Sequence, residues 1–152
     1  MNDTIISSVS GSILNGDLAE GICVIVPPGL TALRVEGKMF FEQMTGRFPQ
    51  EAVDGAAFDG NIKGKHLLYI DTAEHIICNI DDMRELVNGI LATFSDLGIK
   101  DIAMNGIRCD NRPDMTIRPE VYQREFIKEY IAEHPGTFEK ILLVDLRGGF
   151  NR

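Results

Sequence analysis

The stretch that decides the fold is Leu97-Gly98-Ile99-Lys100-Asp101-Ile102-Ala103-Met104-Asn105-Gly106-Ile107-Arg108-Cys109-Asp110-Asn111. Its pattern predicts the end of a helix, then a short buried strand from Ile99 to Met104, then a polar loop from Asn105 to Asn111. Open α/β sheets place their ligands beyond the carboxyl ends of their strands. The loop is therefore the candidate site of the chain.

The clearest helical pattern lies directly before this stretch. Apolar residues advance by steps of three and one, which gives a helix with one apolar face: Met83, Leu86, Val87, Ile90, Leu91, Phe94 and Leu97. Asp81 or Asp82 is expected to cap the N-terminus, because a carboxylate accepts hydrogen bonds from the unpaired N–H groups there. Gly98 is expected to end the helix in the left-handed conformation.

A second helix and a last buried strand follow the loop. Arg118-Pro119-Glu120 predicts a helix start and His134-Pro135-Gly136 its end. Its buried face is expected to hold Val121, Tyr122, Phe126, Ile127, Tyr130 and Ile131. Ile141 to Leu146 then predicts a strand. Such alternation favours right-handed parallel crossovers, and hence a three-layer α/β/α sandwich around a mixed, mostly parallel sheet.

Two further strands are predicted near the N-terminus. Thr4 to Val9 is β-branched and suits an edge strand, whereas Gly21 to Val26 is a continuous apolar run that suits a strand covered on both faces. Pro27-Pro28-Gly29 stops the second strand, because proline cannot donate to a ladder.

A helix is expected after these prolines. Val35, Met39, Phe40 and Met44 recur at helical spacing and Gly46 follows as a stop, although Gly37 weakens the pattern.

The middle of the chain is less regular. Arg47 to Lys65 predicts a long surface connection with one helical turn near Gln50 to Ala56. Leu67 to Ile70 and His75 to Cys78 are two short apolar runs. They form either a hairpin or a strand followed by an irregular segment before the next helix.

Composition narrows the functional class. We expect one domain over residues 1–152, because this length buries a core without disulfides or metal. A net charge of −8 argues against binding to nucleic acid. Three cysteines without a CxxC pair favour a reducing cytoplasm, and no apolar run is long enough for a membrane span.

The groups in the candidate loop suit a phosphate or a sugar. Asn105 offers an amide, Gly106 lies beside exposed backbone N–H groups, and Arg108 can bind an anion through two parallel hydrogen bonds. Pro28-Gly29 is expected to form a wall of the same cleft, and Phe150 to stack on a planar ring. Each motif also has a plain structural use, as a turn, a strand end or a packed terminal residue.

Other chemistry lacks its pattern. His66, His75 and His134 show no metal-ligand spacing, and neither a GxGxxG nor a Walker motif is present, so we expect neither a metal nor a cofactor. Cys109 or Asp110 in the loop would be needed for a hydrolase, but no base is linked to the cysteine in the sequence.

The order of these segments resembles the macro domain, the α/β/α module that binds ADP-ribose. The resemblance rests on these segments: Gly11-Ser12-Ile13, Gly21 to Gly29, Met44-Thr45-Gly46, Leu97 to Met104, Asn105 to Asn111 and Ile141 to Leu146. It implies a macro-like fold, a phosphate loop at Asn105 to Asn111 and an aromatic residue near the adenine, which would be Phe150.

The motifs of that family are only partly present. Ser12 stands where macro domains carry an aspartate that contacts adenine, and Val26 to Gly29 replaces an Asn-rich motif. The resemblance therefore implies binding of a nucleotide-like ligand more than hydrolysis of ADP-ribose linkages.

Three hypotheses follow. The first is a macro-like domain that binds a nucleotide-like or other phosphorylated small molecule at loops 26–29 and 105–111. The second is a non-enzymatic scaffold or homo-oligomer whose pocket has decayed. The third is a hydrolase that uses Cys109 or Asp110.

Overall fold

The structure is a computed structural model that describes residues 4–15, 17–26, 31–45, 56–62, 65–71, 80–107 and 119–145. Its strands are β1 (Ile5–Ser10), β2 (Gly21–Val26), β3 (Ala56–Ile62), β4 (Lys65–Asp71), β5 (Asp101–Asn105) and β6 (Lys140–Asp145). Its helices are α1 (Thr31–Thr45), α2 (Ile80–Asp96) and α3 (Pro119–Glu133). No helix in these described ranges is long and apolar enough to cross a membrane.

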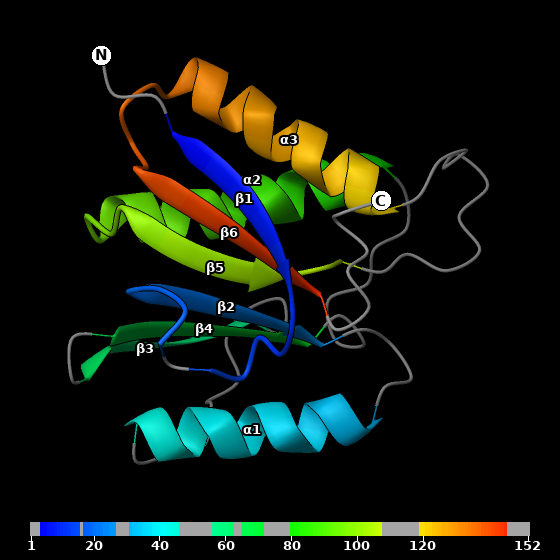
Figure 1. The fold of residues 1–152 in the computed structure, drawn as a ribbon, viewed down its shortest axis with the longest axis vertical. Helices are drawn as coiled ribbons and strands as arrows, with labels where there is room; N and C mark the ends of the chain where they lie inside the picture. Colours follow the sequence, from blue (N-terminus) through cyan, green and yellow to red (C-terminus); the bar gives the residue numbers. More distant parts are fainter. Residues whose placement is uncertain are drawn as a thin grey trace.

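The strands of the described ranges form one six-stranded sheet in the order β1-β6-β5-β2-β4-β3 (Figure 1). Every neighbouring pair is parallel except β3 and β4, which are antiparallel. The predicted mixed, mostly parallel sheet is therefore confirmed. The strand predicted at Thr4 to Val9 lies at an outer edge, and the one predicted at Gly21 to Val26 is fully buried in the middle.

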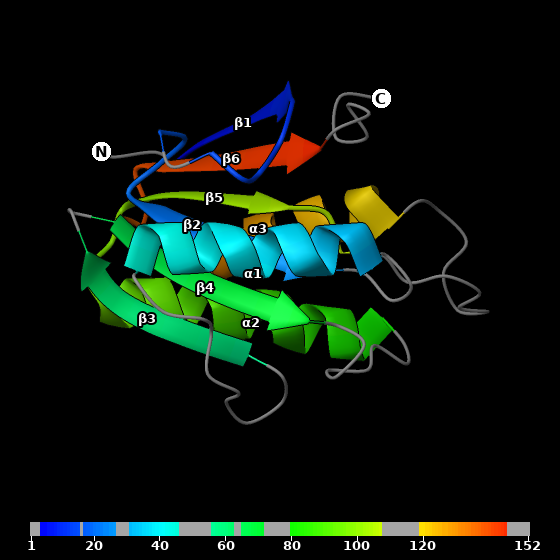
Figure 2. The same ribbon diagram turned by 90° about the horizontal axis from the view of Figure 1, so that it is seen from below.

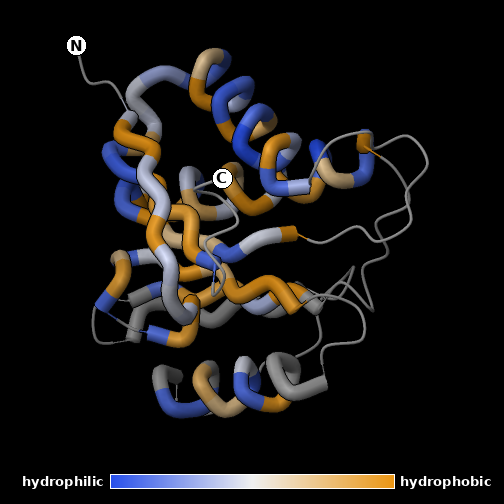
Figure 3. The backbone as a smooth tube through the Cα atoms, turned by 45° about the vertical axis from the view of Figure 1, so that its right-hand side comes forward, coloured by the Kyte–Doolittle hydropathy of each residue, from blue (hydrophilic) through white to orange (hydrophobic). Residues whose placement is uncertain are grey.

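Helices cover both faces of the sheet, which confirms the three-layer α/β/α architecture. Figure 2 shows α1 in front of the sheet and α2 and α3 behind it. Each face has its own apolar cluster, because successive side chains of a strand point to opposite faces. On β2, Cys23 and Ile25 join the cluster of α2 and α3, whereas Ile22 and Val24 join the one on the α1 side. In Figure 3, hydrophobic colour runs along the central strands, while the helices alternate between hydrophilic and hydrophobic segments.

The prediction for α2 is confirmed along most of its length. Its buried residues are Met83, Leu86, Val87, Ile90, Leu91 and Phe94, and Gly98 has a φ of +73° just beyond its end. Two details are wrong. Leu97 is 44% exposed, because the helix ends at Asp96 and the chain turns before it. Asp81 and Asp82 lie inside the first turn instead of at the cap, since the helix begins at Ile80.

The apolar face predicted for α1 is partly wrong. Phe40 is buried, but Val35 and Met39 are 53% and 51% exposed. The side chain of Met44 lies outside the described part of the chain. The buried side of the helix passes through Gly37, which has no side chain to reveal it in a hydrophobic pattern.

Gly37 lets the backbone of α1 lie close to the sheet. A Cβ at this position would be 3.2 Å from Tyr69 Cε2 and 3.4 Å from Val24 Cγ1, on β4 and β2. These distances are tighter than most carbon–carbon contacts in proteins. The residue that weakened the helical pattern is thus the one that sets the spacing between helix and sheet.

The long connection predicted for Arg47 to Lys65 is wrong, because it contains β3. This strand pairs antiparallel with β4, with a register irregularity between Asp59 and Ile62. β4 therefore forms its hairpin with the preceding strand, and its other edge is held by β2, which contradicts a hairpin between Leu67–Ile70 and His75–Cys78. The helical turn predicted near Gln50 lies outside the described residues, except for Ala56, which begins β3.

The last helix and strand agree with prediction. Pro119 is the first residue of α3, and β6 covers Lys140–Asp145, while Leu146 lies outside the described residues. Phe126, Ile127 and Tyr130 are buried as expected, whereas Val121, Tyr122 and Ile131 are only half-buried.

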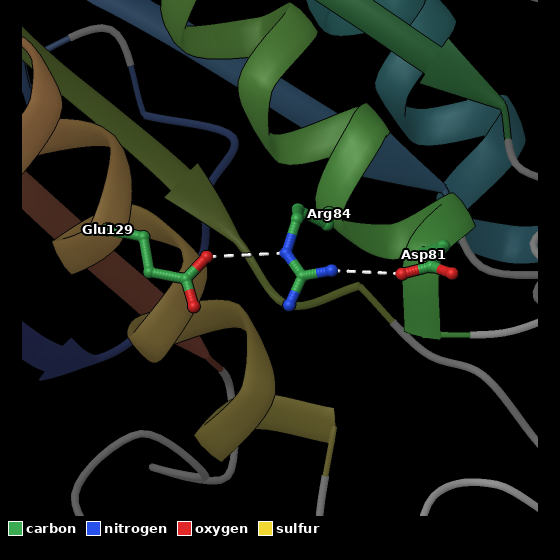
Figure 4. A network of polar contacts seen from close by, with 3 residues as sticks. All are labelled: Asp81, Arg84 and Glu129. Atoms are coloured by element: carbon green, nitrogen blue, oxygen red, sulfur yellow. Dashed lines mark hydrogen bonds and ion pairs between the residues drawn. The ribbon is translucent and has the colours of Figure 1, made fainter.

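Polar and cation–π contacts join α2 to α3. Arg84 on α2 contacts Asp81 at 2.9 Å and Glu129 of α3 at 3.3 Å (Figure 4). Its guanidinium also lies 4.6 Å from the centre of the Phe126 ring. The side chains of these charged groups are 41% to 82% exposed, so the ion pairs add little to stability.

Candidate functional site

The candidate site lies where the strand order of the sheet reverses. β2 and β5 are neighbours in the middle of the sheet, and the chain leaves β2 toward α1 on one face and β5 toward α3 on the other. The diverging connections at such a switch point leave a crevice beyond the carboxyl ends of the two strands. The crevice of this fold is thus expected next to Val26 and Asn105.

The parallel ladder between β2 and β5 ends just before this edge. Its rungs are Gly21 with Ile102, Ile22 with Ala103, and Cys23 with Met104. If the ladder continued in the same register, Ile25 would donate its N–H to Asn105 O and accept from Ile107 N–H. Neither of these two bonds is made.

The side chain of Asn105 takes their place. Its Oδ1 accepts the N–H of Ile25 at 2.7 Å, and its Nδ2 donates to the carbonyl oxygen of Ile25 at 2.7 Å. Both residues are buried, with Asn105 9% exposed. One carboxamide thereby bonds to both backbone groups of Ile25. These two buried groups are satisfied although the backbone of β5 no longer pairs with them.

The two backbone groups that leave the ladder bond to Gln123 on α3. Gln123 Oε1 accepts the N–H of Ile107 at 2.8 Å, and its Nε2 donates to Asn105 O at 3.0 Å. The same Nε2 lies 3.4 Å from Met104 Sδ. Gln123 is fully buried, so its amide is held in place by its surroundings.

Two side-chain amides therefore separate the chain after β5 from β2. Asn105 closes the free end of β2, and Gln123 draws residues 105–107 toward α3. Ile107 is 1% exposed and packs in the cluster shared with α2 and α3, which anchors this segment by apolar burial as well. The result is a fixed segment, residues 105–107, at the root of the predicted ligand loop.

The described residues include only part of the predicted site. Asn105 and the half-exposed Gly106 lie at the strand end as expected. The other predicted ligand residues, Pro28, Gly29, Arg108 and Phe150, lie outside the described residues. Cys109 and Asp110, on which the hydrolase hypothesis rests, lie outside them too, so these roles stay predictions.

Gln123 is the site residue that the sequence pattern missed. It shares the buried face of α3 with Phe126, Ile127 and Tyr130, at steps of three and one. A glutamine on such a face is a buried amide that must find hydrogen-bond partners. The position of Gln123 on this face was therefore a usable sign of a buried polar contact, which the structure places at the end of β5.

The cysteine of β2 has no reactive character. Cys23 is fully buried in the interior, and this burial raises the pKa of its thiol far above the ordinary range. The thiol therefore stays neutral and acts as a small apolar group. Within the part of the chain that the structure describes, no group of three or more His, Cys, Asp or Glu side chains could hold a metal ion.

Comparison with known proteins identifies the fold by structure and not by sequence. No family model and no curated protein match the sequence. The macrodomain of Trypanosoma brucei superposes with a TM-score of 0.61 at 10% identity, over 95% of this chain and 63% of that one. The chain thus spans less than two thirds of that relative. The macrodomain of Mycobacterium tuberculosis DarG has a TM-score of 0.53 at 16% identity, over 93% of this chain and 98% of that one.

A third similar structure contains a ligand. It is the T. brucei macrodomain in complex with ADP-ribose, with a TM-score of 0.61 at 12% identity over 93% of this chain and 63% of that one. Identities this low establish the fold alone. The chain has a divergent macro-domain fold, as the order of its segments predicted.

Proposed function

We propose that this chain binds a nucleotide-like diphosphate, with ADP-ribose as the leading ligand, in the crevice between the ends of β2 and β5. The observation that carries the proposal is the early end of the β2–β5 ladder, where two buried amides bond to the backbone groups that further rungs would use. The region beyond the strand ends at the switch point of an α/β sheet is where such folds bind their ligands. The macro fold supports the choice of ligand, because similar solved structures hold ADP-ribose and ADP.

Each predicted residue has a role in this proposal. Arg108 and backbone N–H groups near Gly106 bind the phosphates, Pro28-Gly29 forms the opposite wall, and Phe150 stacks on the base. Asn105 uses one amide hydrogen and one oxygen lone pair on Ile25. Its second amide hydrogen is the group proposed to reach a sugar hydroxyl. All of these roles are binding contacts and none is a catalytic step, so we propose the protein as a binding module.

Calorimetric titration tests the proposal directly. ADP-ribose should bind and raise the melting temperature, since a ligand of the folded state stabilises by about 2.7 kcal/mol at a hundred times its Kd. ADP should bind more weakly and ribose 5-phosphate weakest, because each lacks part of the proposed contacts. Neither heat nor a shift in melting temperature at millimolar ADP-ribose would contradict the proposal.

A charge-matched pair of variants locates the site. Arg108→Ala should weaken ADP-ribose binding by about tenfold or more, because it removes a charge-assisted hydrogen bond to phosphate. Lys100→Ala is the control, since Lys100 is exposed at the opposite end of β5. Equal affinities in the two variants would remove Arg108 from the site.

The scaffold hypothesis is the second candidate, and a specific feature favours it. Val35 and Met39 lie one helical turn apart on α1 and are both more than half exposed. Contiguous exposed apolar patches mark interfaces between proteins, and this pair would contribute to one. Self-association through α1 should appear in sedimentation equilibrium and disappear in Met39→Lys, whereas a wild-type monomer at high micromolar concentration would count against it.

A further inference from the structure

We propose that Gln123 is a positioning residue of the candidate site, which holds the backbone of residues 105–107 away from β2 at the root of the predicted ligand loop. The effect on ligand binding rests on the proposed function. The effect on the strand end rests only on the hydrogen bonds of Gln123 and Asn105.

Two hydrogen-bond arrangements compete at this strand end. In the first, which the structure shows, Asn105 O and Ile107 N–H bond to Gln123, and the Asn105 side chain bonds to Ile25. In the second, the same two backbone groups would bond to Ile25 and extend the ladder by another rung. The second arrangement would bring the backbone of residues 105–107 alongside β2 and so redirect the root of the predicted ligand loop. Gln123 decides between them by satisfying both backbone groups at once.

A carboxamide is the group that this position requires. The segment presents one donor, Ile107 N–H, and one acceptor, Asn105 O, and a glutamine side chain offers one of each in a fixed plane. A methionine of similar length offers no donor and only a weak sulfur acceptor, and an ionised glutamate offers only acceptors. The three described partners of the Gln123 amide, Ile107 N, Asn105 O and Met104 Sδ, are all uncharged.

The variant Gln123→Glu tests this requirement, because pH controls whether the new carboxyl group can donate a hydrogen bond. Burial raises the pKa of a carboxyl group, so at about pH 5 the variant should hold a neutral acid that both donates to Asn105 O and accepts from Ile107. At about pH 8 the ionised form cannot donate and repels the carbonyl oxygen. Gln43→Glu is the matched control, because Gln43 is exposed on α1.

The readouts separate positioning from folding. ADP-ribose affinity is measured for both variants at both pH values, relative to wild type, under conditions where circular dichroism shows a folded protein. Amide hydrogen exchange at Ile107 and Ile25 is measured in the same samples. Gln123→Met, folded and measured at one pH, gives the result for a side chain without any hydrogen bond.

We expect the ADP-ribose affinity of Gln123→Glu to fall by about tenfold at the higher pH and to recover at the lower pH. The affinity of Gln43→Glu relative to wild type should not depend on pH. Relative to wild type at the same pH, exchange at Ile107 should be faster in Gln123→Glu only at the higher pH. Wild-type affinity in Gln123→Met, or in Gln123→Glu at both pH values, would overturn the inference. If wild type binds no ADP-ribose, the proposed function fails by itself. The exchange rates then decide the inference: faster exchange at Ile107 supports it and unchanged exchange overturns it.

Discussion

The carboxamide of Asn105 forms two hydrogen bonds with the backbone of Ile25, one to its N–H and one to its carbonyl oxygen, each at 2.7 Å. A side chain from one strand therefore completes the hydrogen bonding of its neighbour at the point where the two strands part. This pairing lets a fully buried strand end without an unsatisfied polar group.

Asn105→Ala should destabilise the fold by about 2–6 kcal/mol, since it leaves two buried backbone groups unpaired, each at about 1–3 kcal/mol. Urea unfolding measures the change. Asn88→Ala, at an exposed position of α2, is the control and should change stability by less than about 0.5 kcal/mol. Equal losses in the two variants would mean that the bonds to Ile25 contribute nothing.

Two helical glycines should respond in opposite ways. Gly89 is exposed and a Cβ there would meet nothing within 4 Å, so Gly89→Ala should stabilise by about 0.5–1 kcal/mol through helix propensity. Gly37→Val should destabilise by about 1–3 kcal/mol, because its side chain would press α1 away from Tyr69 and Val24. Thermal unfolding of both variants checks the pair. A stabilised Gly37→Val would show that α1 moves freely over the sheet.

Cys23 should make stability fall at alkaline pH. Burial raises the pKa of its thiol in the folded state, whereas in the unfolded chain the thiol ionises above about pH 8.5. The folded state therefore binds the extra proton, and its free energy of unfolding should drop above that pH by about 1.4 kcal/mol per pH unit from this group. Below that pH the thiol is neutral in both states and contributes no slope.

The measurement is the slope of unfolding free energy against pH in wild type and in Cys23→Ala. The difference between the two slopes isolates this thiol from the other groups that titrate. Identical slopes would mean that the pKa of Cys23 is the same in the folded and unfolded states, which its complete burial argues against.

Arg84→Met should cost about 1 kcal/mol of stability, mostly through the lost cation–π contact with Phe126. The ion pairs with Asp81 and Glu129 are exposed and add little. High salt screens those pairs in wild type but leaves most of the contact with Phe126. The difference in urea midpoint between wild type and variant should therefore persist in high salt, and its disappearance there would assign the effect to the ion pairs.

Most of the fold was predictable because the hydrophobic residues of its buried segments recur at regular spacing. β2, α2 and the strands β5 and β6 are apolar runs or faces whose spacing has one interpretation. β3 was not predictable, because Asp59 and Gly60 are poor strand residues. Its place depends on hydrogen bonds to β4, which leave no mark on the local sequence.

The candidate site was predictable in position but not in construction. The end of β5 was identified from the polar residues after Met104, and Asn105 and Gly106 do lie at that edge of the sheet. The bonds of Asn105 to Ile25, 80 residues away, depend on strand register. Register is fixed by the packing of the whole sheet, so a local pattern cannot give it.

The position of β1 also constrains how the chain folds. β1 pairs only with β6 within the described strands, so residues 5–10 depend on residues 140–145, and Thr4 donates to Phe138 O at 2.6 Å. Closing so long a loop is entropically costly and slow. During synthesis β1 emerges long before β6 and cannot join the sheet until β6 is available, so β1 stays open to chaperones and to mispairing in the interval.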